Sequence, residues 1–168
     1  MTKPSTFTNG AALVLLSHGS LLCGAAQALH EHVGRLRKMG EWLCVEAGFL
    51  NYTTPPFLEA VRRCVERGAK MIVVQPYFLV AGKFVTEDLP EQIAQARAEF
   101  PDLEFVIGEP IGFDTLLADA ILELAAQPRP PQQWRDDLLR APDYCTRNPE
   151  CPLYGTEQCP VSLAGGQL

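Results

Sequence analysis

The sequence has no apolar run long enough to cross a membrane as a helix. The longest uninterrupted run near the N-terminus, residues 11–16, falls far short of the roughly 20 residues that such a helix needs. Only Lys3 adds a positive side chain before this run, and no small-residue cleavage site follows it, so the pattern of a secretory signal is missing. We therefore expect a cytoplasmic protein with no membrane partner.

Positive charge is also scarce. Lys and Arg total 14 against 20 Asp and Glu, which gives a formal net charge of −6, and no basic patch is visible along the chain. We therefore expect no nucleic acid partner. The chain has no G-x-G-x-x-G motif, no P-loop and no G-x-S-x-G motif, so nothing in it supports nucleotide binding or serine hydrolysis.

Proline, by contrast, is abundant, and its distribution divides the chain. Half of the 14 prolines follow Gln127. Because proline restricts φ and lacks an amide donor, that stretch cannot form a long helix or a central strand. Apolar residues make up 47% of the 168 residues, enough for one core. We predict a compact α/β domain over residues 1–127 and an irregular, Pro/Cys-rich extension over residues 128–168.

The body alternates between strand and helix patterns. Near-continuous apolar runs, typical of strands buried on both faces, predict strands at residues 11–17, 43–50, 71–79 and 103–108. Apolar residues at three- and four-residue spacing, with Thr54 and Asp114 as caps, predict helices at residues 21–39, 55–67, 86–100 and 114–126. Helical crossovers between the strands predict a four-stranded parallel sheet with helices on both faces, which makes a three-layer domain.

In such sheets ligands bind beyond the carboxyl ends of the strands. This rule places four segments on one rim, at residues 17–20, 51–53, 77–83 and 109–110. His18 directly follows the first strand, and its neutral imidazole can bind a metal ion or accept a proton near physiological pH. It can equally be a histidine that is only hydrogen-bonded at a strand end.

The other titratable side chains near this rim have plainer interpretations. His30 and His32 are two residues apart on the first predicted helix, so they point to different faces and we expect surface histidines. Glu87 and Asp88 begin the third predicted helix, where carboxylates favour the helix dipole. Each of the two can also face a cation or a substrate amine.

Three sequence features together carry a family resemblance. They are LLSHGS at the first strand, the P-x-F-L-x-A-G turn after the third strand, and the E-D-L-P start of the third helix. Over roughly residues 11–125 the chain resembles the small class II chelatases, the CbiX/SirB family of sirohydrochlorin cobalto- and ferrochelatases. The resemblance implies a chelatase-like α/β fold, often homodimeric. It also implies a cleft for an acidic tetrapyrrole, into which Co²⁺ or Fe²⁺ is inserted without ATP.

The resemblance assigns a role to His18 and shows two departures from the family pattern. His18 matches the histidine that does the metal or proton work, so it is the predicted catalytic residue and a predicted metal ligand. Phe84 stands where the A-G-x-H-V turn usually carries a second histidine, and Asn51 stands where a glutamate usually follows F-L. Phe84 cannot bind a metal ion, and Asn51 offers only an uncharged oxygen.

Further site residues follow from the same resemblance. Lys83 can pair with a substrate carboxylate, and Phe84 can stack on the macrocycle. Replacement metal ligands can come from Glu87, Asp88, Glu109 or Cys23, and Glu87 is the one predicted here. The predicted substrate-binding residues are Ser17, Gly19, Ser20, Asn51, Tyr77, Lys83 and Phe84. The alternative to a chelatase (a lyase) is a non-catalytic tetrapyrrole or metal carrier, or a redox protein, on the same fold.

The extension carries three of the six cysteines. Cys145, Cys151 and Cys159 lie close together, two of them in Cys-Pro pairs, a pattern also found around iron–sulfur clusters. Some longer chelatase relatives have C-terminal iron–sulfur motifs, which favours a cluster by resemblance. Zinc binding or unligated thiols are the alternatives. A zinc or iron–sulfur site usually has four protein ligands, and these cysteines supply three. Cys23, another body cysteine or a partner chain would have to supply the fourth.

Overall fold

The computed structural model describes residues 10–21, 25–133, 154 and 156. These residues fall into two compact units. One contains residues up to 18 together with residues 29–112, and the other contains residues 19–28 together with those from 113 onward. No helix in this described part of the chain is long and apolar enough to span a membrane.

A four-stranded parallel sheet forms the centre of the first unit. The strands are β1 (Ala11–Ser17), β2 (Val45–Phe49), β3 (Met71–Pro76) and β4 (Glu104–Ile107), in the spatial order β2-β1-β3-β4. β1 and β2 are buried almost throughout, because helices cover both faces of a parallel sheet of this kind. The predicted α/β class and the four-stranded parallel sheet are confirmed.

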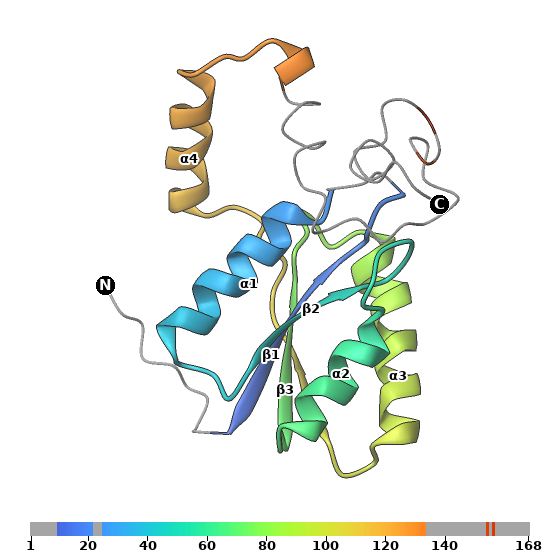
Figure 1. Ribbon diagram of the computed structural model, residues 1–168. Helices are drawn as coiled ribbons and strands as arrows, with labels where there is room; N and C mark the ends of the chain where they lie inside the picture. Colours follow the sequence, from blue (N-terminus) through green and yellow to red (C-terminus); the bar gives the residue numbers. More distant parts are fainter. Residues whose placement is uncertain (1–9, 22–24, 134–153, 155, 157–168) are drawn as a thin grey trace, which may run out of the picture. The chain divides into compact units, whose positions relative to one another are not determined.

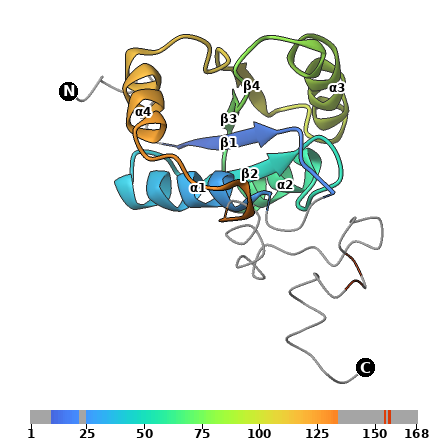
Figure 2. The same cartoon turned by 90° about the horizontal axis from the view of Figure 1, so that it is seen from above.

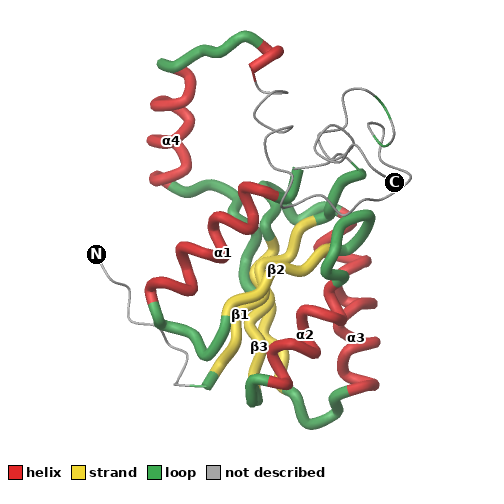
Figure 3. The backbone as a smooth tube through the Cα atoms, in the orientation of Figure 1, coloured by secondary structure: helices red, strands yellow, loops and turns green. Residues whose placement is uncertain are grey.

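Helices cover both faces of this sheet. α1 (Gln27–Met39) lies on one face, and α2 (Phe57–Glu66) and α3 (Leu89–Glu99) lie side by side on the other (Figures 1 and 2). Right-handed crossovers explain this arrangement, because β2 lies on one side of β1 whereas β3 and β4 lie on the other. The colouring of Figure 3 shows the resulting helix, sheet and helix layers.

The main core lies between the sheet and the pair α2 and α3. At Gly48 the helix approaches the sheet so closely that an added Cβ would lie 3.2 Å from Val14 Cγ1 and 3.4 Å from Ala60 Cβ. A larger residue at position 48 would therefore require these neighbours to shift by a few tenths of an ångström. Among the largest fully buried side chains are Leu16, Phe57, Val61, Ile72, Val74 and Leu89.

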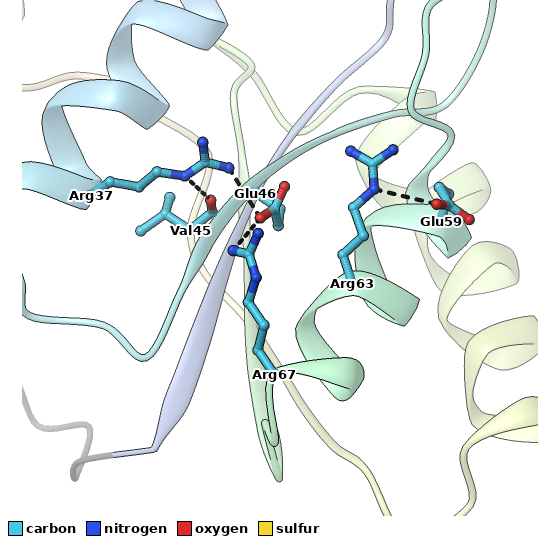
Figure 4. Close-up of polar contacts among 6 residues, drawn as sticks. All are labelled: Arg37, Val45, Glu46, Glu59, Arg63 and Arg67. Atoms are coloured by element: carbon cyan, nitrogen blue, oxygen red, sulfur yellow. Dashed lines mark hydrogen bonds and ion pairs between the residues drawn. The ribbon is translucent and has the colours of Figure 1, made fainter.

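A buried carboxylate ties the edge strand β2 to helices on both faces (Figure 4). Glu46 is only 4% exposed. Arg67, just after α2, donates from Nη1 to Glu46 Oε1 at 2.6 Å. Arg37, in the last turn of α1, lies with Nη2 3.0 Å from the same oxygen and donates from Nε to the Val45 carbonyl at 2.7 Å. The charge of Glu46 is thus fully paired, as a buried ion must be.

The observed elements differ from the predicted ones mainly where helices begin. α2 begins at Phe57 with Pro56 as its N-cap and no side-chain cap bond, so the prediction of Thr54 as the cap is wrong. A π-helical segment, η1 (Phe84–Asp88), precedes α3. The sequence pattern predicted the helix only from residue 86.

α4 (Thr115–Ala125) belongs to the second unit. Its N-cap is Asp114, whose carboxylate accepts a hydrogen bond from the Leu116 amide at 2.8 Å. The predicted cap is confirmed, because an aspartate at this position satisfies one of the free amides of the first turn.

Candidate functional site

The strand order creates a topological switch point at the carboxyl end of β1. The chain leaves β1 for β2 on one side, whereas β3 lies on the other side. A ligand crevice forms where connections diverge in this way. Backbone bonds extend the ladder past the strand ends: the Tyr77 amide donates to the Leu16 carbonyl at 2.7 Å, and the Asn51 amide donates to the His18 carbonyl at 2.9 Å. These bonds hold the loops after β2 and β3 against the end of β1.

His18 lies within a cluster of aromatic rings from three loops. Its ring centroid is 4.2 Å from that of Phe84, with the planes tilted by 44°, and 5.6 Å from that of Tyr52, which meets it edge-on at 70°. Phe78 stacks on Phe84 at 6.0 Å. We call His18, Tyr52, Phe78 and Phe84 the rim cluster. It joins residues that follow β1, β2 and β3.

The rim cluster is open to solvent. The exposed fractions are 52% for Tyr52 and 36% for Phe84, and the neighbouring Leu79 and Val80 are 62% and 73% exposed. Large apolar side chains grouped at the surface mark binding sites more often than scattered ones do. Aromatic rings beside an imidazole can contact a flat, conjugated ligand through their faces and edges.

The turn that begins at Phe84 is π-helical. The Leu89 amide donates to the Phe84 carbonyl, five residues earlier, where a regular α-helix would use the Val85 carbonyl. Pro90, in the first turn of α3, has no amide hydrogen to donate. Turns of the π-helical kind are rare and frequently occur at functional sites. Pro90 is visible in the sequence, but the π-helical turn was not predicted.

The structure brings only part of the predicted site together. Phe84 contacts His18, and Asn51 immediately precedes Tyr52 in the loop after β2. Lys83, the N-cap of η1, and Glu87, within η1, are both exposed. Ser17 ends β1, whereas Gly19 and Ser20 belong to the second unit. Tyr77 lies against His32, with ring centroids 5.5 Å apart. Tyr52 and Phe78 are site residues that sequence reasoning did not select, although both lie in segments that were placed on the predicted rim.

The two helical histidines differ from each other. His32 is exposed as predicted, whereas His30 is half-buried and its ring lies 5.9 Å from that of Phe49. The surface prediction is therefore wrong for His30. Burial first, and then the nearby positive charge of Arg37, lower the pKa of His30 below its ordinary value.

Within residues 10–21 and 25–133, no three His, Cys, Asp or Glu side chains lie close enough together to hold a metal ion. The imidazole of the rim cluster is that of His18. Cys23 and the predicted cluster ligands Cys145, Cys151 and Cys159 lie outside the described residues.

Known proteins with related sequences are metal chelatases. The sirohydrochlorin cobaltochelatase of Sulfolobus acidocaldarius is 33% identical over 113 residues, covering 67% of this chain and 88% of that protein. The chloroplastic sirohydrochlorin ferrochelatase of Arabidopsis thaliana is 30% identical over 109 residues and covers 65% of this chain. This chain spans only about half, 48%, of that plant protein.

A related fold is found among solved structures. SirB from Bacillus subtilis with Fe³⁺ superposes with a TM-score of 0.63 at 26% identity, over 67% of this chain and 45% of SirB. The family model for CbiX matches residues 12–127. That match includes all four strands, η1, and the rim cluster with His18. The chain therefore belongs to the CbiX family.

Proposed function

We propose that this protein inserts Co²⁺ or Fe²⁺ into a sirohydrochlorin-type tetrapyrrole. The observation that carries the proposal is the position of His18. Its imidazole lies at the topological switch point of a parallel sheet, among exposed aromatic rings. Family membership and the chelatase relatives support the reaction class.

The chemistry requires a base, a metal ligand and a surface for the macrocycle. Two pyrrole nitrogens each lose a proton as the divalent metal bonds to the four ring nitrogens. In this proposal the His18 imidazole accepts one of these protons while the other passes to solvent, or it holds the incoming ion and both protons pass to solvent. The exposed ring of Phe84 packs against the macrocycle, and burial of apolar surface there contributes to its binding.

A single protein imidazole suits the transfer of a metal ion that is the substrate. Metal ions are held firmly when three or four protein ligands surround them. One imidazole, even with Glu87 as a further ligand, leaves most positions on the ion to water and then to the four nitrogens of the macrocycle. His18 can therefore release the ion to the ring without losing several bonds at once.

The remaining assignments are predictions from the sequence. The residues proposed to contact the substrate are Ser17, Gly19, Ser20, Asn51, Tyr77 and Lys83. Lys83 is proposed to pair with a carboxylate of the substrate, and Glu87 is proposed as a further metal ligand. An iron–sulfur cluster on Cys145, Cys151 and Cys159, a homodimer and a cytoplasmic location also remain predictions. The domain boundary at residue 127 remains one as well.

An anaerobic absorbance time course tests the proposal. Sirohydrochlorin and Co²⁺ or Fe²⁺ are mixed with the wild-type protein, with His18→Ala, and with His32→Ala as the matched control. We expect multiple turnovers above the uncatalysed rate, a loss of about 100-fold or more in His18→Ala, and little change in His32→Ala. A bound macrocycle spectrum without turnover would overturn the proposal in favour of a carrier.

A further inference from the structure

Tyr52 adopts a backbone conformation that bulky residues rarely adopt. Its φ is +60°, in the left-handed region where a Cβ is crowded. The Thr53 amide donates to the Asn51 carbonyl at 2.6 Å. This bond closes a three-residue γ-turn around Tyr52, and the form with positive φ at the central residue is the rare, strained one.

Strain of this kind persists only where the surroundings hold it. Two connections to His18 do so here. The Asn51 amide donates to the His18 carbonyl at 2.9 Å, and the Tyr52 ring meets the His18 ring edge-on at 5.6 Å. Another backbone bond, from the Leu50 amide to the Ser17 carbonyl at 3.0 Å, precedes them. The loop after β2 is thus attached to the very residue that carries the proposed chemistry.

Phe84, the first residue of η1, contacts the same imidazole. Its ring lies 4.2 Å from His18 and stacks on Phe78. The lone pair of a neutral imidazole lies in the ring plane, so the orientation of the ring decides where a metal ion or proton is held. Rings from two separate segments restrict that orientation more than either ring can alone.

We infer that Tyr52 is a positioning residue for His18, and that the strained turn exists to place its ring against the imidazole. The inference rests on the proposed function for its link to catalysis. The contact between the two rings can be tested without it. The ring of Tyr52, and not its hydroxyl, carries the role, because the contact is between ring edges and faces.

Three variants separate positioning from a merely structural role. Tyr52→Phe keeps the ring, so we expect kcat within about twofold of wild type. Tyr52→Leu removes the ring, so we expect kcat to fall by about tenfold or more while KM changes by less than about threefold. Tyr52→Gly adopts positive φ without strain, so its melting temperature should equal or exceed that of Tyr52→Leu while its kcat stays low. Equal kcat in wild type, Tyr52→Phe and Tyr52→Leu would overturn the inference.

The imidazole itself provides a readout that does not depend on turnover. The chain has only three histidines, and each lies against a different aromatic ring: His18 on Tyr52, His30 on Phe49 and His32 on Tyr77. In ¹⁵N-histidine-labelled protein, with His18→Ala to assign the signal, Tyr52→Leu should move the ring resonances of His18 alone. Tyr77→Leu, the matched control, should move those of His32.

The two proposals fail in different ways. If wild-type protein shows no turnover, the proposed function fails, and the His18 resonances alone decide whether Tyr52 orients the ring. If Tyr52→Leu lowers kcat while the His18 resonances stay in place, Tyr52 acts on the substrate directly and the positioning role is overturned.

Discussion

Two clusters on the same sheet depart from the usual rule that charged side chains are exposed and apolar ones are buried. Around Glu46 a charged group is buried, with an exposed fraction of 4%. In the rim cluster the aromatic rings of Tyr52 and Phe84 are 52% and 36% exposed. Charged residues are rarely buried unless they are paired. Apolar rings that are grouped at the surface are more informative about function than single exposed apolar residues.

The partners of the two clusters explain the difference. Both arginines around Glu46 come from helix ends, so the cluster is complete within the protein and contributes to folding. The rings of Tyr52 and Phe84 contact His18 on one side and solvent on the other. A cluster that is completed internally stabilises the fold, whereas one left open can bind a ligand.

The largest expected effect on stability is at Glu46. Glu46→Ala removes the buried carboxylate with which both arginines pair, and we expect a loss of about 2 kcal/mol in the free energy of unfolding, because hydrogen bonds to charged groups contribute roughly that much. Urea denaturation measures this loss. The activity per folded molecule should be unchanged, because the cluster lies away from the carboxyl ends of the strands.

Glu59 provides the matched control for that substitution. It also pairs with two arginines, Arg62 at 3.8 Å and Arg63 at 3.3 Å, but its side chain is 41% exposed. Water can replace the lost pairing there, so Glu59→Ala should cost only a small part of the Glu46→Ala effect. Equal losses in the two variants would show that burial is not what makes Glu46 important.

A new histidine in the rim cluster should strengthen metal binding. Phe84→His places a second imidazole beside His18, whose ring is 4.2 Å from that of Phe84. We expect Co²⁺ to bind at least about tenfold more tightly, about 1.4 kcal/mol, because two nitrogen ligands then hold the ion. Calorimetric titration with Co²⁺ measures the affinity.

Phe78→His is the control for this gain. Phe78 lies behind Phe84, at 6.0 Å between ring centroids, so we expect its replacement to leave Co²⁺ affinity close to that of wild type. If both histidine variants bind alike, the metal site is not at the His18 ring.

The smallest expected effect is a pH dependence that arises at His30. Because burial and Arg37 lower the pKa of His30 in the folded protein, the unfolded chain takes up the proton first as the pH falls. The stability that His30 contributes is therefore present above its ordinary pKa of 6.5 and is lost as the pH falls through the lower folded value. His30→Gln should flatten the fall in stability between about pH 7.5 and about pH 5.

His32→Gln is the control for the pH experiment. His32 lies on the same helix but is exposed, so its replacement should leave the pH slope of wild type in place. Urea denaturation at several pH values measures both variants. A slope that survives in His30→Gln would assign the pH dependence to other groups.

Several features could be predicted because they depend on neighbouring residues along the chain. The apolar run at residues 11–17 predicted β1 with its observed bounds, and Asp114 was correctly predicted to cap α4. The apolar run also predicted His18 at a strand end. The failures concern where helices begin: a π-helical turn at Phe84 precedes α3, and Thr54 precedes a helix that begins only at Phe57.

Contacts between residues distant in the sequence could not be predicted, because they depend on the order of the strands in the sheet. The spacing of apolar residues along the chain does not reveal that order. His18, Tyr52 and Phe84 meet because β1 lies between β2 and β3. Glu46 is paired because α1 and α2 end beside the same edge strand, which brings Arg37 and Arg67 to it. Residue patterns were enough to predict the parallel α/β layers and the chemistry available at the strand ends, because hydrophobic burial and chain handedness act on local patterns. Which of those side chains touch follows from the strand order of the folded chain.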